Sequence, residues 1–401
     1  MGRRDCQLRR EVHRQRQGRR LSFALSPGRE LEDAVYAATR ATVGDAQLQT
    51  SPLIKAIVDR SERYTSDRAR LGSPADKLGD LAARAVFFTI ADAMKVAVPF
   101  VELANRDALP AARPLRVIDL GAGCGAMSLG LIEAVTRLGS PIGLSITAID
   151  RDAAALGIAA AAVRQLATVR GLDVTFTPRT DDATGAKLAS VDLVVIGTLL
   201  NELAAPARQA LVERALAAIG DDGAVIIIEP ALRETARALH ELRDVILATG
   251  AGHVFAPCTR AGAPCPSLAN PNDWCHEDRT IKLPPLTREL SRLTHLRDDG
   301  MKFSYLVLRR QPLSVVEGPG AWRIVSPSRS PKGKHEVTGC SDPGWVSLRL
   351  LRRHRTDANR DLERADRGDV VVISAPPGDD RVEVVADTAV VRHVPAKPRG
   401  S

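Results

Sequence analysis

Apolar residues in the first quarter of the chain recur at the three- and four-residue spacing of amphipathic helices. This spacing predicts helices over Glu30–Thr42, Pro52–Tyr64 and Lys77–Leu103. The third pattern is the clearest, and its apolar side holds Leu78, Leu81, Ala85, Phe88, Ala91, Met94 and Val98. The prolines of Ala108–Pro114 predict a linker after this helical region, which spans residues 29–110.

Further along, short apolar runs alternate with helical segments, which predicts a parallel sheet with helical crossovers. The expected strands are Arg116–Leu120, Ser145–Ile149, Asp173–Pro178, Asp192–Gly197, Ala224–Glu229, Gly252–Ala256 and Lys302–Arg309. The expected helices are Met127–Leu138, Ala153–Val169, Gln209–Ile219 and Leu232–Leu247. We therefore expect an α/β domain of the Rossmann-like kind over residues 111–310, with seven strands, the last two forming an antiparallel pair. In the remaining residues 311–401, Asp369–Ser374 and Arg381–Val391 predict a small β appendage.

A glycine-rich turn connects the first strand of this domain to its first helix. Asp119 ends the strand, and Gly121, Gly123 and Gly125 follow before the helix begins. Glycines let the backbone turn sharply and approach a ligand closely, because no Cβ stands in the way. The helix start adds free N–H groups. The pattern predicts a nucleotide-binding corner.

Three interpretations of this corner are open. Gly121-x-Gly123-x-x-Ala126 also fits the dinucleotide fingerprint, which is a weak signal alone, and a glycine turn without a ligand is the third. S-adenosylmethionine is favoured because Asp119 could accept a hydrogen bond from its ammonium group or a bound water, and no pyrophosphate needs neutralising. Asp150 ends the second strand, where it could bind ribose hydroxyls. The stretch Val117–Asp150 resembles motif I and the following acidic strand end of class I methyltransferases.

The fourth strand ends in Gly197-Thr-Leu-Leu-Asn-Glu202, which is the usual catalytic corner of such folds. Asn201 and Glu202 could face a substrate, and Asn201 is also a candidate for cofactor binding. The alternative is an ordinary polar helix start. The segment lacks the Asn-Pro-Pro-Tyr pattern that grips an exocyclic amine, and it lacks a Pro-Cys nucleophile. We therefore assign no catalytic residue.

Composition narrows the class of partner. The hydrophobic content of 44% supports a packed core, and the aromatic content of 3% argues against a broad base-stacking platform. The net charge of +8 favours a polyanionic partner. No apolar run approaches the roughly 20 residues that span a bilayer. We expect a monomer that does not associate with membranes.

The first 20 residues are strongly basic. They hold Arg3, Arg4, Arg9, Arg10, Arg14, Arg16, Arg19 and Arg20. We interpret residues 1–28 as a disordered basic tail. The alternatives are an RNA-contacting arm, a mitochondrial transit peptide, or residues upstream of the start codon that is used.

Three of the six cysteines lie in a proline-rich segment of about 45 residues between the sixth and seventh strands, where a tight hairpin would suffice. The N-terminus shows no secretory signal, so clustered cysteines suggest a metal rather than disulfides. Cys258, Cys265 and Cys275 are one ligand short, and Cys340 is the best fourth, with His253 and His276 as competitors. Four thiolates suit zinc or an iron–sulfur cluster. The absence of a Cys-x-x-Cys pair argues mildly against a zinc ribbon, and free cysteines are the third alternative.

Six motifs together resemble the methyltransferase-like ribosomal small-subunit assembly family, which has mitochondrial members and bacterial relatives. They are Asp119-Leu-Gly-Ala-Gly-Cys-Gly125, Ile228-Glu-Pro230, Ala256-Pro-Cys258, Cys265-Pro266, Asp273-Trp-Cys-His276 and Lys302-Phe-Ser-Tyr305. The resemblance covers roughly residues 80–355. It implies a class I methyltransferase fold with a cysteine-rich insertion at 256–300. It also implies a [4Fe–4S] cluster held by Cys258, Cys265, Cys275 and Cys340. Glu277 stands where an aromatic residue is more usual.

The resemblance further implies association with the small ribosomal subunit and its rRNA during maturation, in a bacterial cytoplasm or, alternatively, a mitochondrial matrix. The expected function is an S-adenosylmethionine-dependent methyltransferase-like protein that binds this RNA and assists assembly. Two alternatives are open: an assembly factor without catalysis, and a small-molecule or protein methyltransferase with structural zinc. Arg323–Lys334 with Arg349–Arg355 is the candidate phosphate-binding patch, or else a solvated basic face.

Overall fold

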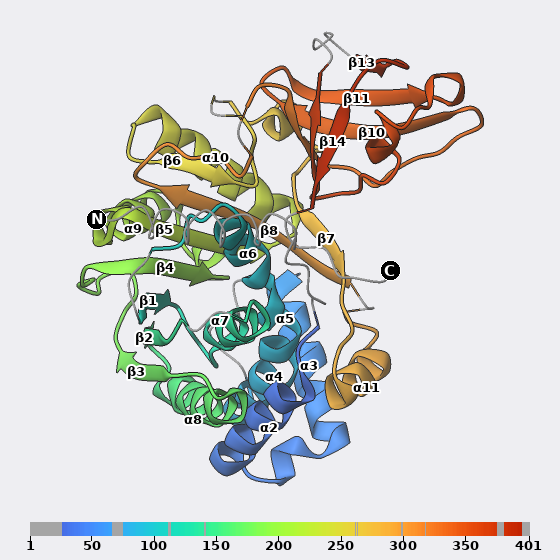
Figure 1. The fold of residues 1–401 in the computed structure, drawn as a ribbon. Helices are drawn as coiled ribbons and strands as arrows, with labels where there is room; N and C mark the ends of the chain where they lie inside the picture. The colour runs from blue at the N-terminus through green and yellow to red at the C-terminus, as the bar shows by residue number, and fades with distance from the viewer. Residues whose placement is uncertain are drawn as a thin grey trace, which may run out of the picture.

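The computed structural model describes residues 26–65, 75–110, 114–139, 142–260, 262, 264–297, 300–316, 318–374 and 381–394. Residues 1–25, which make up nearly all of the basic tail, and with them Cys6, lie outside these ranges. Figure 1 shows a central sheet with N-terminal helices at one end of the molecule and a second, C-terminal sheet at the other. None of the described helices has the length and apolar composition needed to cross a bilayer.

The central sheet confirms the predicted α/β fold. Its strands are β1 (Leu115–Leu120), β2 (Leu144–Asp150), β3 (Val174–Thr180), β4 (Val191–Gly197), β5 (Ile219–Pro230), β6 (His253–Ala256), β7 (Glu277–Thr280) and β8 (Gly300–Arg309). They are ordered β3-β2-β1-β4-β5-β8-β6, and β7 also pairs with β8. Strands β1 to β5 are parallel, whereas β8 runs antiparallel to β5, β6 and β7. The seven expected strands are all present, and β7 is an additional one.

Both faces are buried in the middle of this sheet, where β4 is a nearly continuous apolar run, whereas the edge strand β3 has exposed residues. On one face, Leu193 and Val195 of β4 pack in the core formed with the N-terminal helices, α7 (Ala126–Arg137) and α8 (Ala153–Arg170). On the other face, Val194 and Ile196 pack against α9 (Ala205–Ala218) and α10 (Arg233–Ala248). The alternation along β4 thus places α8 and α10 on opposite sides of the sheet.

The N-terminal region is helical, as predicted, but its third helix is not continuous. Its elements are α2 (Arg29–Val43), η1 (Ala46–Leu48), α3 (Thr50–Thr65), α4 (Lys77–Ala83), the π-helical η3 (Arg84–Thr89), α5 (Ile90–Asp92), η4 (Ala93–Lys95) and α6 (Ala97–Asn105). The prediction of one helix over Lys77–Leu103 is therefore wrong. Pro99 lacks the N–H that a regular helix would bond to Lys95, which accounts for the break there. Gly130 of α7 approaches this break closely, since a Cβ on it would come within 1.8 Å of the Ala93 carbonyl oxygen.

The segment between β6 and β8 contains more structure than the sequence predicted. Besides β7 it holds η6 (Pro266–Leu268) and α11 (Pro285–Thr294). Glu32, from α2, accepts hydrogen bonds from Leu286 N at 3.1 Å and from Thr287 N at 2.7 Å. This carboxylate satisfies free N–H groups at the start of α11 and is well placed in the field of the helix dipole. A residue at position 32 thus holds a helix more than 250 residues away.

The C-terminal β appendage is confirmed as a six-stranded sheet. Its strands are β9 (Ala321–Ile324), β10 (Lys334–Ser341), β11 (Gly344–Leu351), β12 (Val370–Ile373), β13 (Arg381–Val384) and β14 (Val390–His393), with the short helices η7 (Arg352–His354) and η8 (Arg360–Leu362). The strand order is β13-β11-β10-β9-β12-β14. Arg381–Val391, expected as one strand, forms two strands at opposite edges. The sheet has its own core around Trp322, Leu348 and Val371.

A buried ion cluster joins this appendage to the central sheet. Arg323 of β9 is 3% exposed, and it donates hydrogen bonds to Glu102 of α6 at 2.8 and 2.9 Å and to Glu277 of β7 at 3.3 Å. The hydroxyl of Tyr305, on β8, donates to Glu102 at 2.7 Å and also contacts Arg323. The unusual Glu277 therefore has a structural partner. Arg323, expected in the basic patch, is instead removed from the surface.

We expect Arg323→Met to lower the free energy of unfolding by about 3–5 kcal/mol, because it leaves the buried carboxylate of Glu102 without its cation, while Glu277 keeps its ion pair with Arg279 at 2.9 Å. The matched control is Arg292→Met, which breaks an exposed Arg292–Glu289 pair and should cost less than about 1 kcal/mol. Urea unfolding followed by circular dichroism measures both. Equal losses in the two variants would show that the buried cluster contributes no more than a surface pair.

Candidate functional site: a glycine cleft and a cysteine cluster

The glycine turn lies in a cleft of about 600 Å³ at the carboxyl ends of β1, β2 and β4, which we call the glycine cleft. Its glycines have the left-handed backbone expected of them, with φ of 69° at Gly121, 50° at Gly123 and 87° at Gly125. A side chain at Gly125 would place its Cβ 2.9 Å from that of Ala159 on α8. The turn thus needs glycine both for its conformation and for its contact with α8.

Asp150 is in the wall of this cleft and orders the turn. Its carboxylate accepts hydrogen bonds from Gly123 N at 2.8 Å and from Asp152 N at 2.9 Å. The amides of Gly121 and Ala122 donate to the carbonyl oxygen of Ile149 at 2.8 and 3.1 Å. The predicted juxtaposition of Asp150 with the glycines is therefore present in the structure.

Asp119 is not among the residues that line the cleft. It is 1% exposed and accepts hydrogen bonds from Ser128 N at 3.2 Å and Ser128 Oγ at 2.6 Å, which fasten the end of β1 to the start of α7. Burial raises the pKa of Asp119 to about 6, against the opposing effect of the Ser128 hydrogen bonds. Its Oδ1 has no partner among the described residues and is buried. A direct role of Asp119 in ligand binding stays a prediction.

The N-terminal helices supply a wall of the cleft that sequence reasoning missed. Arg84 and Phe88 of the π-helical η3, with Arg60 and Tyr64 of α3, line it. Arg84 pairs with Asp152 at 2.6 Å, and its Nη2 lies 3.5 Å from where a Cβ of Gly123 would be. No local motif marks these residues, because they are far from the glycine turn in sequence. The residues after β3, Asp182 to Thr184, also line the cleft and were missed.

The loop after β4 is held by a buried carboxylate. Glu229, at the end of β5, accepts hydrogen bonds from Leu200 N at 3.0 Å and Asn201 N at 3.1 Å. The amide side chain of Asn201 donates to the carbonyl oxygen of Thr198 at 2.7 Å. Glu202 faces the glycine cleft, whereas Asn201 lines a neighbouring groove. Burial raises the pKa of Glu229 to about 7.

The four predicted cysteine ligands are close enough to affect one another's ionisation. Burial raises the pKa of the Cys275 thiol well above its ordinary value, and the charges of Cys265, Cys340 and Cys258 raise it further. Cys124 lies apart, buried in the glycine turn. The competitor His276 stacks on Trp274 at 5.7 Å between ring centroids. No group of three or more His, Cys, Asp or Glu residues in the described part of the chain is arranged to hold a metal ion.

Helix α10 orders the cysteine segment, which the sequence analysis did not foresee. Arg237 donates to the carbonyl oxygens of Ser267, Asn270 and Asp273 at 2.8–3.0 Å. One turn further on, His240 Nε2 lies 3.1 Å from the carbonyl oxygen of Cys275, and the carboxylate of Asp244 accepts from Cys265 N at 2.7 Å. The signal available in the sequence is the spacing of Arg237, His240 and Asp244 along one helix face.

The strand order of the central sheet and the glycine turn followed by an acidic strand end define a fold of the class I methyltransferase type. The chain belongs to the family described as mitochondrial small ribosomal subunit Rsm22, whose model matches residues 87–371, more than half of the sequence. A comparison with curated proteins gives no match.

Solved methyltransferase structures show a distant similarity. Magnesium protoporphyrin IX methyltransferase from Synechocystis PCC 6803, with bound SAM, is 13% identical, with a TM-score of 0.33 over 64% of this chain and 97% of that chain. The plantazolicin methyltransferase BpumL, in complex with SAH, is 11% identical, with a TM-score of 0.34 over 66% of this chain and 99% of that chain. The fold assignment rests on the strand order of the central sheet and on the family match.

The raised pKa of Glu229 predicts a pH dependence of stability. Its value in the folded protein, about 7, lies above the ordinary 4.5. Between these two values the native state keeps a proton that the unfolded state has lost. As the pH rises from about 4.5 to 7, this group therefore lowers the free energy of unfolding, by up to about 1.4 kcal/mol per pH unit. Glu229→Gln should remove this slope, measured by urea unfolding at several pH values.

The exposed Glu62→Gln is the control for losing a carboxylate as such. Its stability should follow that of the wild type across this pH range. If the difference in free energy of unfolding between Glu229→Gln and the wild type is constant from pH 4.5 to 7, Glu229 does not titrate in that pH range.

Proposed function

We propose that the protein binds S-adenosylmethionine in the glycine cleft and associates with RNA of the small ribosomal subunit during its assembly. The observation that carries this proposal is the family match over residues 87–371, since the family is described by the mitochondrial small ribosomal subunit. For this chain we propose a mitochondrial matrix or bacterial cytoplasmic setting, the matrix being closer to the family description.

The cleft supports the choice of cofactor. Its volume of about 600 Å³ falls in the range of small-molecule sites. Asp150 lines the cleft and holds the glycine turn, and we propose that it also accepts hydrogen bonds from the ribose hydroxyls. When bound, S-adenosylmethionine supplies a methyl group on a sulfonium. The residues of this chain would act by orientation, since the described cleft shows no nucleophile–base pair of the kind that activates an acceptor.

One observation favours a binding protein without catalysis as the second candidate. In the loop after β4, Glu229 binds the backbone and the Asn201 amide donates to Thr198, so both polar groups act within the protein. Glu202 alone of these three lines the cleft. These internal hydrogen bonds are what we expect of a methyltransferase fold that only shapes an RNA-binding surface.

We propose that Cys258, Cys265, Cys275 and Cys340 hold a [4Fe–4S] cluster, with zinc as the alternative. The pKa values of Cys275 and Cys340 are raised because burial and the neighbouring cysteines disfavour their thiolates, and a bound metal centre would offset the negative charge of the deprotonated ligands. Burial lowers the pKa of Arg243, but the charges of the nearby Cys258 and Cys265 help to raise it overall. This guanidinium therefore offsets part of the negative charge that deprotonated cysteines would carry.

The RNA partner is supported by exposed cations on the C-terminal sheet. Arg329 and Lys332, before β10, and Arg352 and Arg353, after β11, are exposed. The two stretches meet, because Arg352 N donates to the carbonyl oxygen of Gly333 at 3.0 Å. We call these four residues the basic tip. None has a carboxylate partner within the described ranges, whereas the neighbouring Arg349 and Arg355 pair with Glu383 and Glu363.

To test cofactor binding, we would titrate S-adenosylmethionine into the purified protein by calorimetry. Asp150→Ala should lower the affinity at least about tenfold, through the loss of charge-assisted hydrogen bonds to ribose and the loosened glycine turn. The exposed Asp173→Ala, just before β3, should bind as the wild type does. Equal affinity in both variants would mean that the cofactor assignment is wrong.

To test the cluster, we would purify the protein without oxygen and measure iron, sulfide, zinc and absorbance. We expect about four irons and four sulfides per chain, with a broad band near 400 nm. Cys275→Ser should lose the metal and melt at lower temperature, whereas Cys124→Ser, in the glycine turn, should keep it. Stoichiometric zinc without sulfide would replace the cluster by zinc, and unchanged metal content in Cys275→Ser would exclude this ligand set.

A further inference from the structure

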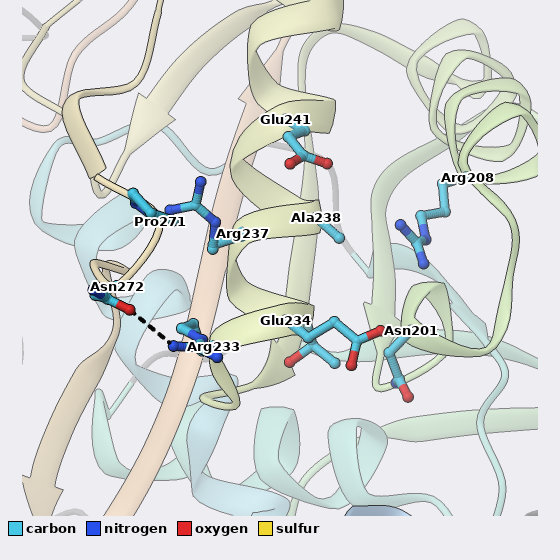
Figure 2. Close-up of a pocket in the computed structure, with 10 residues that line it drawn as sticks. Asn201, Arg208, Arg233, Glu234, Arg237, Ala238, Glu241, Pro271 and Asn272 are labelled. Carbon is cyan, nitrogen blue, oxygen red and sulfur yellow. Dashed lines mark hydrogen bonds between the residues drawn. The ribbon is translucent and has the colours of Figure 1, made fainter. Parts of the chain in front are cut away.

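A second hollow, which we call the α10 groove, crosses the exposed face of α10 next to the loop after β4. It has a volume of about 620 Å³. Figure 2 shows Glu234 and Glu241 along one face of α10, with Asn201 and Arg208 facing them, and Arg233 directed to Asn272 of the cysteine segment. Three separate segments therefore build the groove: α10, the β4–α9 region and the cysteine segment.

The groove is polar and has charges of both signs. Its lining has no aromatic residue, and Ala238 and Pro271 are its apolar members. Two arginines keep donors for a ligand: Arg208 uses Nε on the carbonyl oxygen of Leu200, and Arg233 uses Nη1 on Asn272 at 3.3 Å. Arg237 is committed to the carbonyl oxygens of the cysteine segment.

The two carboxylates of the groove are also available. Glu234 and Glu241 are exposed, and neither forms an ion pair with any residue of the described ranges. A site for anions alone would gain from their absence, because they repel phosphate. Their presence beside two arginines indicates a ligand that is anionic at some atoms and a hydrogen-bond donor at others.

We propose that the α10 groove binds the sugar–phosphate backbone of single-stranded RNA, with phosphates on Arg208 and Arg233 and ribose hydroxyls donating to Glu234 and Glu241. Guanidinium groups suit phosphate, and the 2′-hydroxyl is the donor by which a protein distinguishes RNA from DNA. The absence of an aromatic residue in the lining leaves the bases unstacked there. This inference rests on the proposed RNA partner and names where and how that RNA is recognised.

The position of the groove relates it to the glycine cleft. Asn201 lines the groove, and its side chain donates to the carbonyl oxygen of Thr198, which lines the cleft. Glu202, the next residue, is on the cleft side. RNA seated in the groove would therefore pass one short turn from the cofactor.

The test is fluorescence anisotropy with labelled single-stranded RNA and DNA of the same sequence, over a range of salt concentrations. The Arg208→Glu/Arg233→Glu double variant should lose at least about tenfold in RNA affinity and reduce the salt slope by about 1.4, the value for two contacts on a single strand. Arg164→Glu, an exposed arginine on α8 across the sheet, is the matched control and should bind as the wild type does.

Replacing the carboxylates should change the preference for RNA over DNA. Glu234→Gln/Glu241→Gln should bind DNA more tightly, because repulsion is removed, and the ratio of RNA to DNA affinity should fall towards one. Arg352→Glu/Arg353→Glu in the basic tip should weaken RNA and DNA equally and leave that ratio unchanged. Melting temperatures and S-adenosylmethionine affinities of all variants verify that each one is folded.

The outcomes separate this inference from the proposed function. If wild-type RNA binding persists but the arginine double variant keeps its affinity and salt slope, the groove is not on the RNA path, while the RNA partner stands. An unchanged RNA-to-DNA ratio in the glutamine variant overturns the ribose contact and with it the proposal. If the wild type binds neither nucleic acid, both the inference and the RNA partner fall.

Discussion

The structure depends on one buried cation. Arg323 belongs to the C-terminal sheet, yet its partner Glu102 belongs to the N-terminal helical region and its partner Glu277 to the central sheet. Burying three charges is tolerated only when they are paired and hydrogen-bonded, so the relative position of the two sheets is narrowly specified. Cys340 lies on β10, directly opposite Arg323 of β9. The ion cluster therefore also sets where the fourth cysteine stands relative to the other three.

Helix α10 connects the features that a function needs. Its buried residues pack on the central sheet, and its polar residues fix the cysteine segment and line the α10 groove. Arg237 and Arg233 differ by one turn but have different tasks: the first is bound to three loop carbonyls, while the second keeps donors for a ligand. The cysteine segment and the groove are therefore connected both through α10 and directly, since Pro271 and Asn272 line the groove.

The sequence was sufficient for the central fold because parallel strands buried on both faces have an unmistakable apolar pattern, and because the glycines at 121, 123 and 125 are required by local backbone geometry. It was insufficient where structure depends on distant partners. The long helix was predicted as continuous although Pro99 lies within it, and η3 and the placement of Arg84 in the cleft follow from tertiary packing. Arg323 looked like a surface cation, since burial of a charge depends on Glu102, 221 residues away.

The hydrogen bonds from α11 to Glu32 mean that a shortened protein needs the N-terminal helices to keep α11 intact. The segment recognised as the Rsm22 family begins at residue 87, after Glu32, Arg60 and Arg84, and ends at residue 371, inside β12. A polypeptide cut to those limits would leave the first turn of α11 uncapped and one wall of the glycine cleft missing. It would also lack β13 and β14, whose valines fill the core of the C-terminal sheet. The region that the family model matches is thus shorter than the unit that folds.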